Sequence, residues 1–218
     1  MTHASREAML ARIRAAITSG NPATVVDGNS GRYDIPADLD MATRVAQFAH
    51  RVEEYKAWVG QCRGADIAAV IYGRLRLRNV RTMVVPHDVP ESWLMGEDEV
   101  TYVRDSALAR HDIAACAGVI TGAAVGIAQT GTIVLDGGAT QGRRMLTLLP
   151  DYHVCVVRAS TIVTSVPHAF SLLGHNAPTP RPAYTFISGP SATSDIELNR
   201  VEGVHGPRTL DVCIVTDW

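Results

Sequence analysis

The sequence predicts an α/β fold with three layers, in which a mainly parallel sheet has helices on both faces. Short apolar runs rich in β-branched residues recur between residues 82 and 215, and helical patterns lie between them. This alternation is typical of parallel sheets, whose strands are buried on both faces. The composition agrees, since 46% of the 218 residues are hydrophobic and 19% are charged, as in ordinary globular proteins.

The first 36 residues are predicted to be an N-terminal helix and a mobile linker that precede the α/β domain of residues 37–218. Met9, Leu10, Ile13 and Ile17 fall on one stripe of a short amphipathic helix over residues 5–18. Residues 19–37 are rich in Gly, Asn, Asp and Pro, a composition typical of loops. The segment is then either a flexible arm or an arm whose apolar stripe docks on a partner subunit.

A long helix is predicted over residues 37–61, and a second helix over residues 65–77. Apolar residues recur in the first at alternating spacings of four and three, which gives one continuous seam. These residues are Met41, Val45, Phe48, Val52, Tyr55 and Val59. The seam either packs on the helix's own domain or forms a homodimer interface.

The strands and helices after residue 80 follow the same alternation. The predicted strands are 82–85, 100–103, 118–121, 132–135, 153–157, 184–187 and 210–215, and the predicted helices are 142–149, 161–173 and 195–199. Ligands of such folds bind at the carboxyl ends of the strands. We therefore expect the glycine-rich loops of the chain to share that rim.

Composition also excludes several functions. The net charge of −2 argues against a general nucleic-acid binder, which needs a basic surface. No apolar run approaches the roughly 18 residues of a membrane span, and charges replace the apolar core of a signal peptide, so a cytoplasmic protein is expected. The four cysteines are scattered and the histidines lack metal-ligand spacing, so we expect free thiols, no metal and no cofactor in this chain.

The first glycine loop, residues 126–138, is the strongest candidate for a ligand site. Its polar members are Gln129, Thr130, Gly131 and Thr132, and hydroxyls and exposed backbone N–H groups suit a carboxylate or phosphate. After it, Arg143 and Arg144 begin a predicted helix, where an anion would meet both the helix dipole and a guanidinium. Alternatively, one arginine supports a neighbouring loop and the other is solvated.

A second loop offers Ser188, Gly189 and Ser191 as ligand-binding residues. Ser194 and Glu197 have capping-box spacing, so a structural role explains them, whereas Asp195 is a candidate acid–base group. In the third loop, His205 lies between glycines, where an imidazole could titrate near neutral pH and contact a ligand.

These loops together resemble the LUD domain family, in particular its LutC/YkgG group. The matching segments are Gly126–Leu135, Gly142–Arg144, Ser188–Ser191, Asp195–Glu197 and Gly203–Arg208, and the resemblance extends from about residue 65 onward. It implies a fold like the NagB/RpiA/CoA-transferase group. It also implies membership of a three-protein system that oxidises L-lactate to pyruvate, with iron–sulfur clusters in the two partner subunits.

One position departs from the family pattern, which usually has glutamate where this chain has Gln129. Transferases of the related fold group use a glutamate nucleophile, and glutamine cannot form the acyl intermediate. Either the residue only hydrogen-bonds a loop, or catalysis has been lost or passed to Asp136, Asp195 or Glu197.

Three functions follow from the sequence. The favoured one is a subunit of an L-lactate-oxidising system, in which the glycine loops bind a small anion or a partner. The alternatives are a stand-alone enzyme on a phosphorylated or CoA-linked small molecule, and a non-catalytic interaction module.

Overall fold

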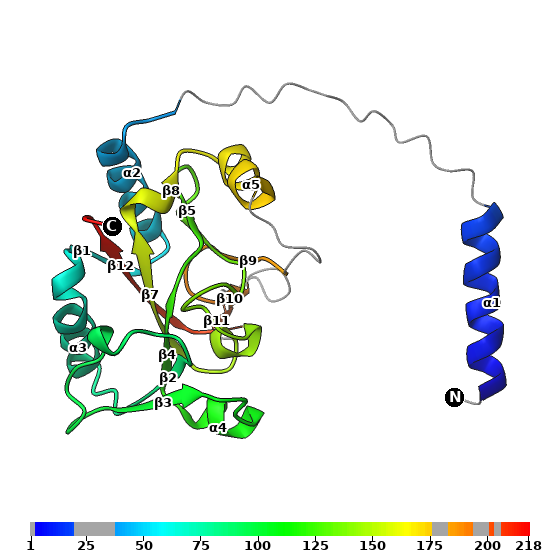
Figure 1. The fold of residues 1–218 in the computed structure, drawn as a ribbon, viewed down its shortest axis with the longest axis horizontal. Helices are drawn as coiled ribbons and strands as arrows, with labels where there is room; N and C mark the ends of the chain where they lie inside the picture. The colour runs from blue at the N-terminus through cyan, green and yellow to red at the C-terminus, as the bar shows by residue number, and fades with distance from the viewer. Residues whose placement is uncertain (1–2, 20–37, 176–182, 194–200, 203–205) are drawn as a thin grey trace. The chain divides into compact units, whose positions relative to one another are not determined.

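The structure is a computed structural model that describes residues 3–19, 38–175, 183–193, 201–202 and 206–218. The chain divides into two compact units, Met1–Ile35 and Pro36–Trp218. The first contains helix α1 (His3–Ser19), which forms where the sequence predicts a helix (Figure 1). All other described elements belong to the second unit.

Helix α2 (Met41–Glu54) begins at Asp40, whose side chain accepts a hydrogen bond from the Thr43 backbone N–H at 3.0 Å. The sequence predicts that this helix extends to residue 61, and this predicted C-terminal end is wrong. Lys56 has a positive φ of 64°, which a helix cannot continue through, and Trp58–Cys62 forms strand β1 instead. A short 3₁₀ turn then leads into α3 (Ile67–Leu77).

Six parallel strands form the main sheet in the order β1-β12-β7-β4-β2-β3 (Figure 1). The strands besides β1 are β2 (Thr82–Pro86), β3 (Thr101–Asp105), β4 (Gly118–Gly122), β7 (Tyr152–Arg158) and β12 (Thr209–Val215). Each overlaps a predicted strand, and the ends agree to within two residues. The predicted α/β class with a mainly parallel sheet is therefore confirmed.

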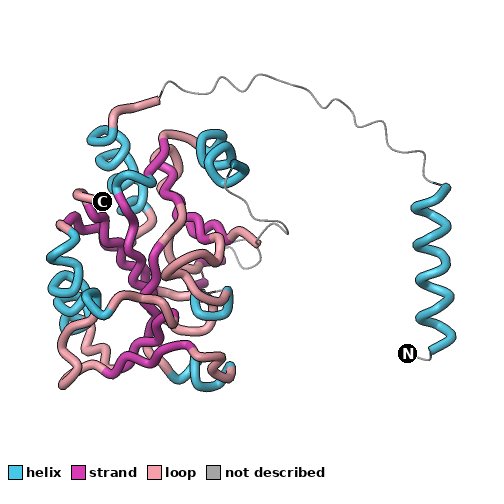
Figure 2. Tube along the Cα trace, in the orientation of Figure 1, coloured by secondary structure: helices cyan, strands magenta, loops and turns pink. Residues whose placement is uncertain are grey.

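Helices cover both faces of this sheet because successive strand residues point to opposite sides. In β7, Val154 and Val156 pack in one core with Ile71 of α3. The intervening Cys155 and Val157 pack on the other side with residues of α2, namely Val45, Phe48 and Val52. Figure 2 shows the strands of the sheet with α3 alongside them.

A second, smaller sheet has the order β8-β5-β6-β9 and was not predicted. Its strands are β5 (Val125–Ile127), β6 (Thr132–Leu135), β8 (Ile162–Val163) and β9 (Thr185–Ile187). Two predicted strands, 132–135 and 184–187, thus belong here rather than to the parallel sheet. Helix α5 (Val166–His175) packs on this sheet through Ala169 and Leu173. It begins five residues later than predicted, because residues 162–163 are in a strand.

The remaining elements are short. They are α4 (Arg110–Ala115), the antiparallel pair β10 (Ala192–Thr193) and β11 (Val201–Glu202), and 3₁₀ turns at Glu91–Trp93, Arg144–Thr147 and Ala159–Thr161. The helix predicted over 142–149 is therefore only the 3₁₀ turn Arg144–Thr147, and the helix predicted over 195–199 lies outside the described residues.

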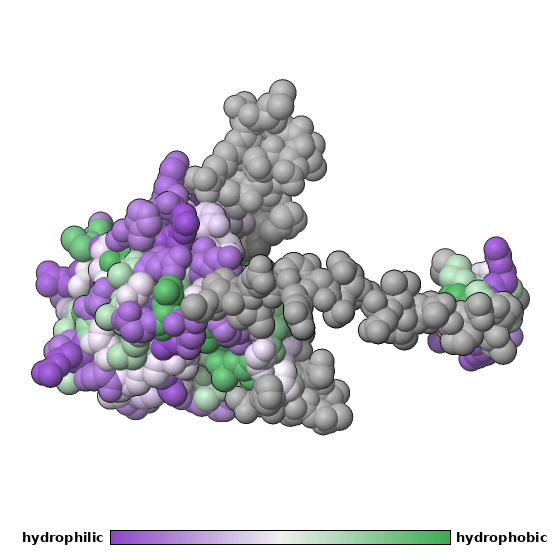
Figure 3. Space-filling model, turned by 90° about the horizontal axis from the view of Figure 1, so that it is seen from above, coloured by the Kyte–Doolittle hydropathy of each residue, from purple (hydrophilic) through white to green (hydrophobic). Residues whose placement is uncertain are grey.

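The surface visible in Figure 3 is mostly hydrophilic with small hydrophobic patches, as in ordinary globular proteins. Among the described helices, none is both long and apolar enough to cross a membrane.

Candidate functional site

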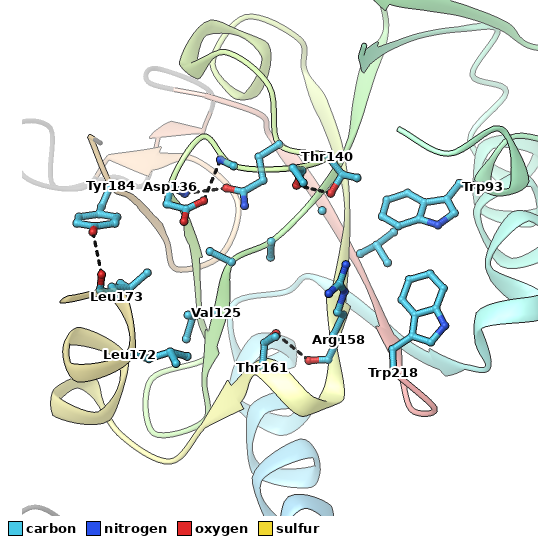
Figure 4. A pocket seen from close by; sticks show the side chains of 17 residues that line it. Trp93, Val125, Asp136, Thr140, Arg158, Thr161, Leu172, Leu173, Tyr184 and Trp218 are labelled. Carbon is cyan, nitrogen blue, oxygen red and sulfur yellow. Dashed lines mark hydrogen bonds between the residues drawn. The ribbon is translucent and has the colours of Figure 1, made fainter. Parts of the chain in front are cut away.

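A cavity of about 350 Å³ lies at the carboxyl ends of β4, β7 and β12 (Figure 4). We call it the carboxyl-end cavity. Its lining includes Gly122 at the end of β4, Arg158 at the end of β7 and Trp218 just after β12. The position is the one at which open parallel sheets bind their ligands. The cavity lies within the size range of small-molecule sites.

Arg158 is the candidate ligand-binding group of this cavity. Figure 4 shows its side chain rising from the end of β7 into the cavity, with Asp136 across from it. The guanidinium lies 5.8 Å from the ring centroid of Trp218, and among the described residues it has no hydrogen-bond or ion-pair partner. Trp218 in turn stacks on Trp93 with ring centroids 6.2 Å apart. The cavity therefore presents an arginine that can hold a carboxylate or phosphate through two parallel hydrogen bonds.

The loop 136–142 forms another wall and is held by its own hydrogen bonds. Oε1 of Gln141, which is buried, accepts hydrogen bonds from the backbone N–H groups of Asp136 at 2.7 Å and Gly137 at 3.2 Å. Thr140 has a positive φ of 63°, and its backbone N–H donates to Asp88 at 2.8 Å. A threonine in this backbone region is strained, and such strain is often found at functional sites. The loop therefore enters the cavity in a fixed conformation.

The opposite wall of the carboxyl-end cavity is apolar. Val125, Leu172 and Leu173 line it from β5 and α5. The cavity thus combines one cation, the Asp136 carboxylate, the Thr161 hydroxyl and an apolar wall. This combination suits a small ligand that carries an anionic group, a hydrogen-bonding group and a short apolar part. Within the described ranges, no cluster of three His, Cys, Asp or Glu side chains could hold a metal ion.

The residues predicted in the first glycine loop have structural partners. Residues 125–134 form the β5–β6 hairpin, whose turn contains the exposed Gln129. Thr130 Oγ1 lies 2.7 Å from Thr132 Oγ1, which lies 2.8 Å from Ser188 Oγ. Gly131 has φ 61°, and a Cβ there would lie 2.8 Å from the Arg51 backbone in α2. The hydroxyls therefore bond one another, and the glycine permits close packing of the hairpin on α2.

Arg143 is also held within the fold. Its Nε and NH2 donate to the two carboxylate oxygens of Asp105 at 2.7 and 2.6 Å, and NH2 also donates to the Leu108 carbonyl at 2.9 Å. The Arg143 guanidinium lowers the pKa of the mostly buried Asp105 carboxyl. This geometry matches the alternative in which one of the two arginines supports a neighbouring loop.

Arg144 and the second glycine loop line a different cavity of about 250 Å³, which we call the amino-end cavity. Ser188, Gly189 and Ser191 contribute to it, together with His153 near the start of β7 and Leu210 near the start of β12. A third cavity of about 320 Å³ shares Asp136 and Gln141 with the first cavity and Arg144 and Thr147 with the second. The expectation of one rim at the carboxyl ends is therefore wrong for these residues, because the second loop lies near the opposite ends of the strands. The candidates Asp195 and His205 lie outside the described residues.

His153 does not suit acid–base chemistry although it borders the amino-end cavity. Its side chain is buried, and Nε2 lies 2.8 Å from Thr121 Oγ1. Burial lowers the pKa of His153 to about 4, so the imidazole is neutral at pH 7. Its role is a hydrogen bond within the core.

Sequence reasoning missed Arg158, Trp93 and Trp218. The signal for Arg158 was present, because this residue directly follows the predicted strand 153–157 and the carboxyl ends of such strands carry ligand-binding groups. The two tryptophans carry no such signal, since residues 93 and 218 meet only in the folded chain.

Comparisons with known proteins identify the family. Residues 45–215 match the model of the LUD domain. The chain is 40% identical over 208 residues to lactate utilization protein C of Deinococcus radiodurans, covering 95% of this chain and 93% of that protein. It is also 39% identical over 98 residues to the uncharacterized protein YkgG of Escherichia coli, covering 42% of this chain and 41% of that one.

Solved structures agree with these matches. A crystal structure of a DUF162 family protein from Deinococcus radiodurans superposes with a TM-score of 0.69 at 36% sequence identity, covering 81% of this chain and 99% of that one. The sequence match and the shared fold extend over most of the α/β unit. This chain therefore belongs to the LUD domain family.

Proposed function

We propose that this chain acts in L-lactate utilization and binds a small carboxylate, of the size of lactate or pyruvate, in the carboxyl-end cavity. The observation that carries the proposal is Arg158, a guanidinium in a cavity at the carboxyl ends of three strands. Its support is the near full-length match to a protein named lactate utilization protein C. Both lactate and pyruvate carry the carboxylate that such an arginine would bind.

The other groups of the cavity fit the rest of such a molecule. The Asp136 carboxylate can accept a hydrogen bond from a ligand hydroxyl. The side chains of Val125, Leu172 and Leu173 offer an apolar surface to a methyl group. Gly138 donates to Asp136 Oδ1 at 2.9 Å, which holds the carboxylate in place and leaves acceptor capacity on the carboxylate for a ligand hydroxyl.

Oxidation of lactate to pyruvate releases two electrons and two protons, so it requires an electron acceptor. We propose that iron–sulfur partner subunits accept the electrons and that this chain contributes ligand binding to the assembly. Among the described cysteines only Cys62 and Cys213 lie side by side, which fits this division because iron–sulfur clusters need several cysteine ligands in one place.

Ligand binding can be tested by calorimetric titration of the isolated protein with L-lactate and with pyruvate. We expect Arg158→Gln to weaken the binding of the preferred carboxylate at least tenfold, because a charge-assisted bidentate contact is lost. Arg144→Gln in the amino-end cavity is the matched control and should leave the affinity within twofold. Equal affinity of the wild-type and Arg158→Gln proteins would overturn this assignment.

The role in lactate utilization needs a separate test. Deletion of the gene in its host should abolish growth on L-lactate and spare growth on pyruvate, and affinity purification of the tagged protein should recover iron–sulfur proteins. Normal growth of the deletion strain on L-lactate would refute the role. Recovery of no iron–sulfur protein would refute the proposed division of labour.

The amino-end cavity supports a second candidate, a phosphorylated small molecule. Arg144 borders it with the hydroxyls of Ser188 and Thr147, and among the described residues the Arg144 side chain has no ion-pair partner. Titration with inorganic phosphate distinguishes the two: for this candidate Arg144→Gln weakens binding and Arg158→Gln does not. Absence of binding by both anions would overturn both ligand proposals.

A further inference from the structure

Two cysteines from distant parts of the chain lie together at the β1–β12 pairing. Cys62 Sγ is 3.2 Å from Cys213 Sγ. The two strands are parallel neighbours in which Gly60 pairs with Cys213 and Cys62 pairs with Val215, so the thiols are diagonal neighbours on the sheet. Both sulfurs face the core beneath α3. This arrangement lies outside the cavities described above.

We propose that Cys62 and Cys213 form an oxidisable dithiol, a modification site that a hydroperoxide converts to a disulfide. A disulfide needs an S–S distance of about 2.05 Å, about 1 Å less than the present separation. Because diagonal neighbours on a sheet are farther apart than directly paired residues, closing the bond requires side-chain rotation together with a local shift of the ends of β1 and β12 toward each other. Cys62 is partly exposed and can meet the oxidant, whereas Cys213 is buried behind it. The outer thiol is therefore the one that reacts first.

The reaction has two balanced steps. Burial raises the pKa of the Cys62 thiol, so this thiol first gives up its proton to solvent. The thiolate then attacks one peroxide oxygen, so an S–O bond forms, the O–O bond breaks, and hydroxide leaves and is protonated to water. The Cys213 sulfur then attacks the Cys62 sulfur, so the S–S bond forms, the S–O bond breaks, and the released hydroxide takes the Cys213 proton as water. The two thiols lose two electrons and two protons, and hydrogen peroxide is reduced to two waters.

The other two cysteines lack such a neighbour among the described residues. Cys155 faces the opposite side of the sheet, where its sulfur donates to the Gly122 carbonyl at 3.7 Å and accepts from Thr121 Oγ1 at 3.9 Å. Cys116 lies at the end of α4, 3.5 Å from the Asp112 carbonyl. The geometry therefore selects one pair.

The dithiol also lies next to one wall of the carboxyl-end cavity. Both the N–H and the Oγ1 of Thr216 donate to the Cys62 carbonyl, at 3.0 and 3.2 Å. The backbone N–H of Gly64 donates to Asp217 at 2.7 Å, and Trp218 packs against Gly64. A bond between the sulfurs would thus fasten the segment that places Trp218 in the cavity wall.

The test treats the full-length reduced protein with hydrogen peroxide, followed by alkylation in denaturant and peptide mapping. We expect the loss of two alkylatable thiols, a peptide pair that joins Cys62 to Cys213, and a melting temperature raised by about 5 °C, since the bond closes a long loop. Cys116→Ser, the matched control, should still form the link. Cys62→Ser and Cys213→Ala should each abolish the Cys62–Cys213 link. Two variants are used so that the test still decides if one of them fails to fold.

Two results would overturn the proposal. One is retention of all alkylatable thiols after peroxide treatment. The other is oxidation of Cys62 to the sulfinic acid while Cys213 remains a thiol, which would show that the buried sulfur cannot reach its neighbour.

Discussion

The amino and carboxyl ends of the main sheet place charged side chains in opposite environments. Near the amino ends of β7 and β12, the fully buried Asp211 accepts hydrogen bonds from Arg74 at 2.7 Å, Arg78 at 2.9 Å and the Tyr152 hydroxyl at 2.7 Å. At the carboxyl ends, Arg158 points into a cavity, and among the described residues its side chain has no ionic partner. At the amino ends the charges form a closed polar network. At the carboxyl ends Arg158 is a cation whose side chain has no ionic partner among the described residues.

The two ends of the sheet therefore separate structural charges from a binding group. A charge whose hydrogen bonds are all made within the protein stabilises the fold, and its loss leaves partners unpaired. A cation beside a cavity contributes little to stability and keeps its binding capacity for a ligand. Mutations at the amino ends should therefore lower the free energy of unfolding, and mutation of Arg158 at the carboxyl ends should lower ligand affinity.

Removal of Asp211 should have the largest effect on stability. In Asp211→Ala the guanidinium groups of Arg74 and Arg78 lose their common partner, which we expect to lower the free energy of unfolding by about 3 kcal/mol. Urea denaturation monitored by circular dichroism measures the change. Tyr152→Phe, which removes one hydrogen bond to the carboxylate, is the milder control at about 1.5 kcal/mol. A loss below about 1 kcal/mol in the alanine variant would show that the Asp211 network is not a major stabilising element of the fold.

The glycine of the β5–β6 turn should come next. Gly131→Ala combines a positive φ with a Cβ that would lie 2.8 Å from the α2 backbone, and we expect a loss of about 2 kcal/mol. Gly137 has φ 72° but open space around its Cα, so Gly137→Ala isolates the backbone cost of about 1 kcal/mol. Equal losses in urea denaturation would show that the hairpin does not need its close approach to α2.

The Asp105–Arg143 pair should contribute about 1 kcal/mol, because the Arg143 side chain is 43% exposed. The pair lowers the pKa of Asp105 below 3.8, so its stabilisation is full above the unfolded value and is lost as the pH falls through the lowered folded value. Thermal unfolding of wild type and Asp105→Asn from pH 7 to pH 3 should show a stability difference that is constant above about pH 5 and shrinks below 3.8. A difference that grows on acidification would contradict this sign.

The smallest effect on stability should come from Arg158. Arg158→Gln removes no hydrogen bond or ion pair between described residues, so the free energy of unfolding should change by less than about 0.5 kcal/mol. The same variant should show the largest loss of carboxylate affinity, at least tenfold. Destabilisation of the Arg158→Gln protein would show that this arginine has a structural role, like the charges at the amino ends of the strands.

Local patterns explain which parts of the fold the sequence predicts well. The strands of the main sheet, such as β7 and β12, are continuous apolar runs, and burial on both faces imposes that pattern. In the second sheet, β6 and β9 coincide with predicted strands, whereas β5 and β8 carry no comparable signal because they contain only three and two residues. The sequence pattern misplaces the end of α2 because the apolar spacing continues into β1, although the positive φ of Lys56 ends the helix before β1 begins.

The site residues were less predictable because their roles depend on partners distant in sequence. Arg143 and Arg144 are neighbours in the chain, yet only the fold shows that Asp105 binds the first. The hydroxyls of Thr132 and Ser188 look like ligand groups until the pairing of β6 with β9 brings them together. Arg158 was within reach of sequence reasoning, since the end of a central strand is a general location for binding groups.

The strand order also has a consequence for the time course of folding. Strand β1 joins the sheet only through β12, and Cys62 and Cys213 in these strands are 151 residues apart. During synthesis on the ribosome, β1 therefore has no partner until almost all of the second unit has been made. The unpaired backbone of β1 and its Trp58 and Val59 side chains would be exposed for that period. Such exposure favours misassociation in slowly folding parallel sheets. Protection of this edge by a chaperone would matter most in the interval before β12 is translated.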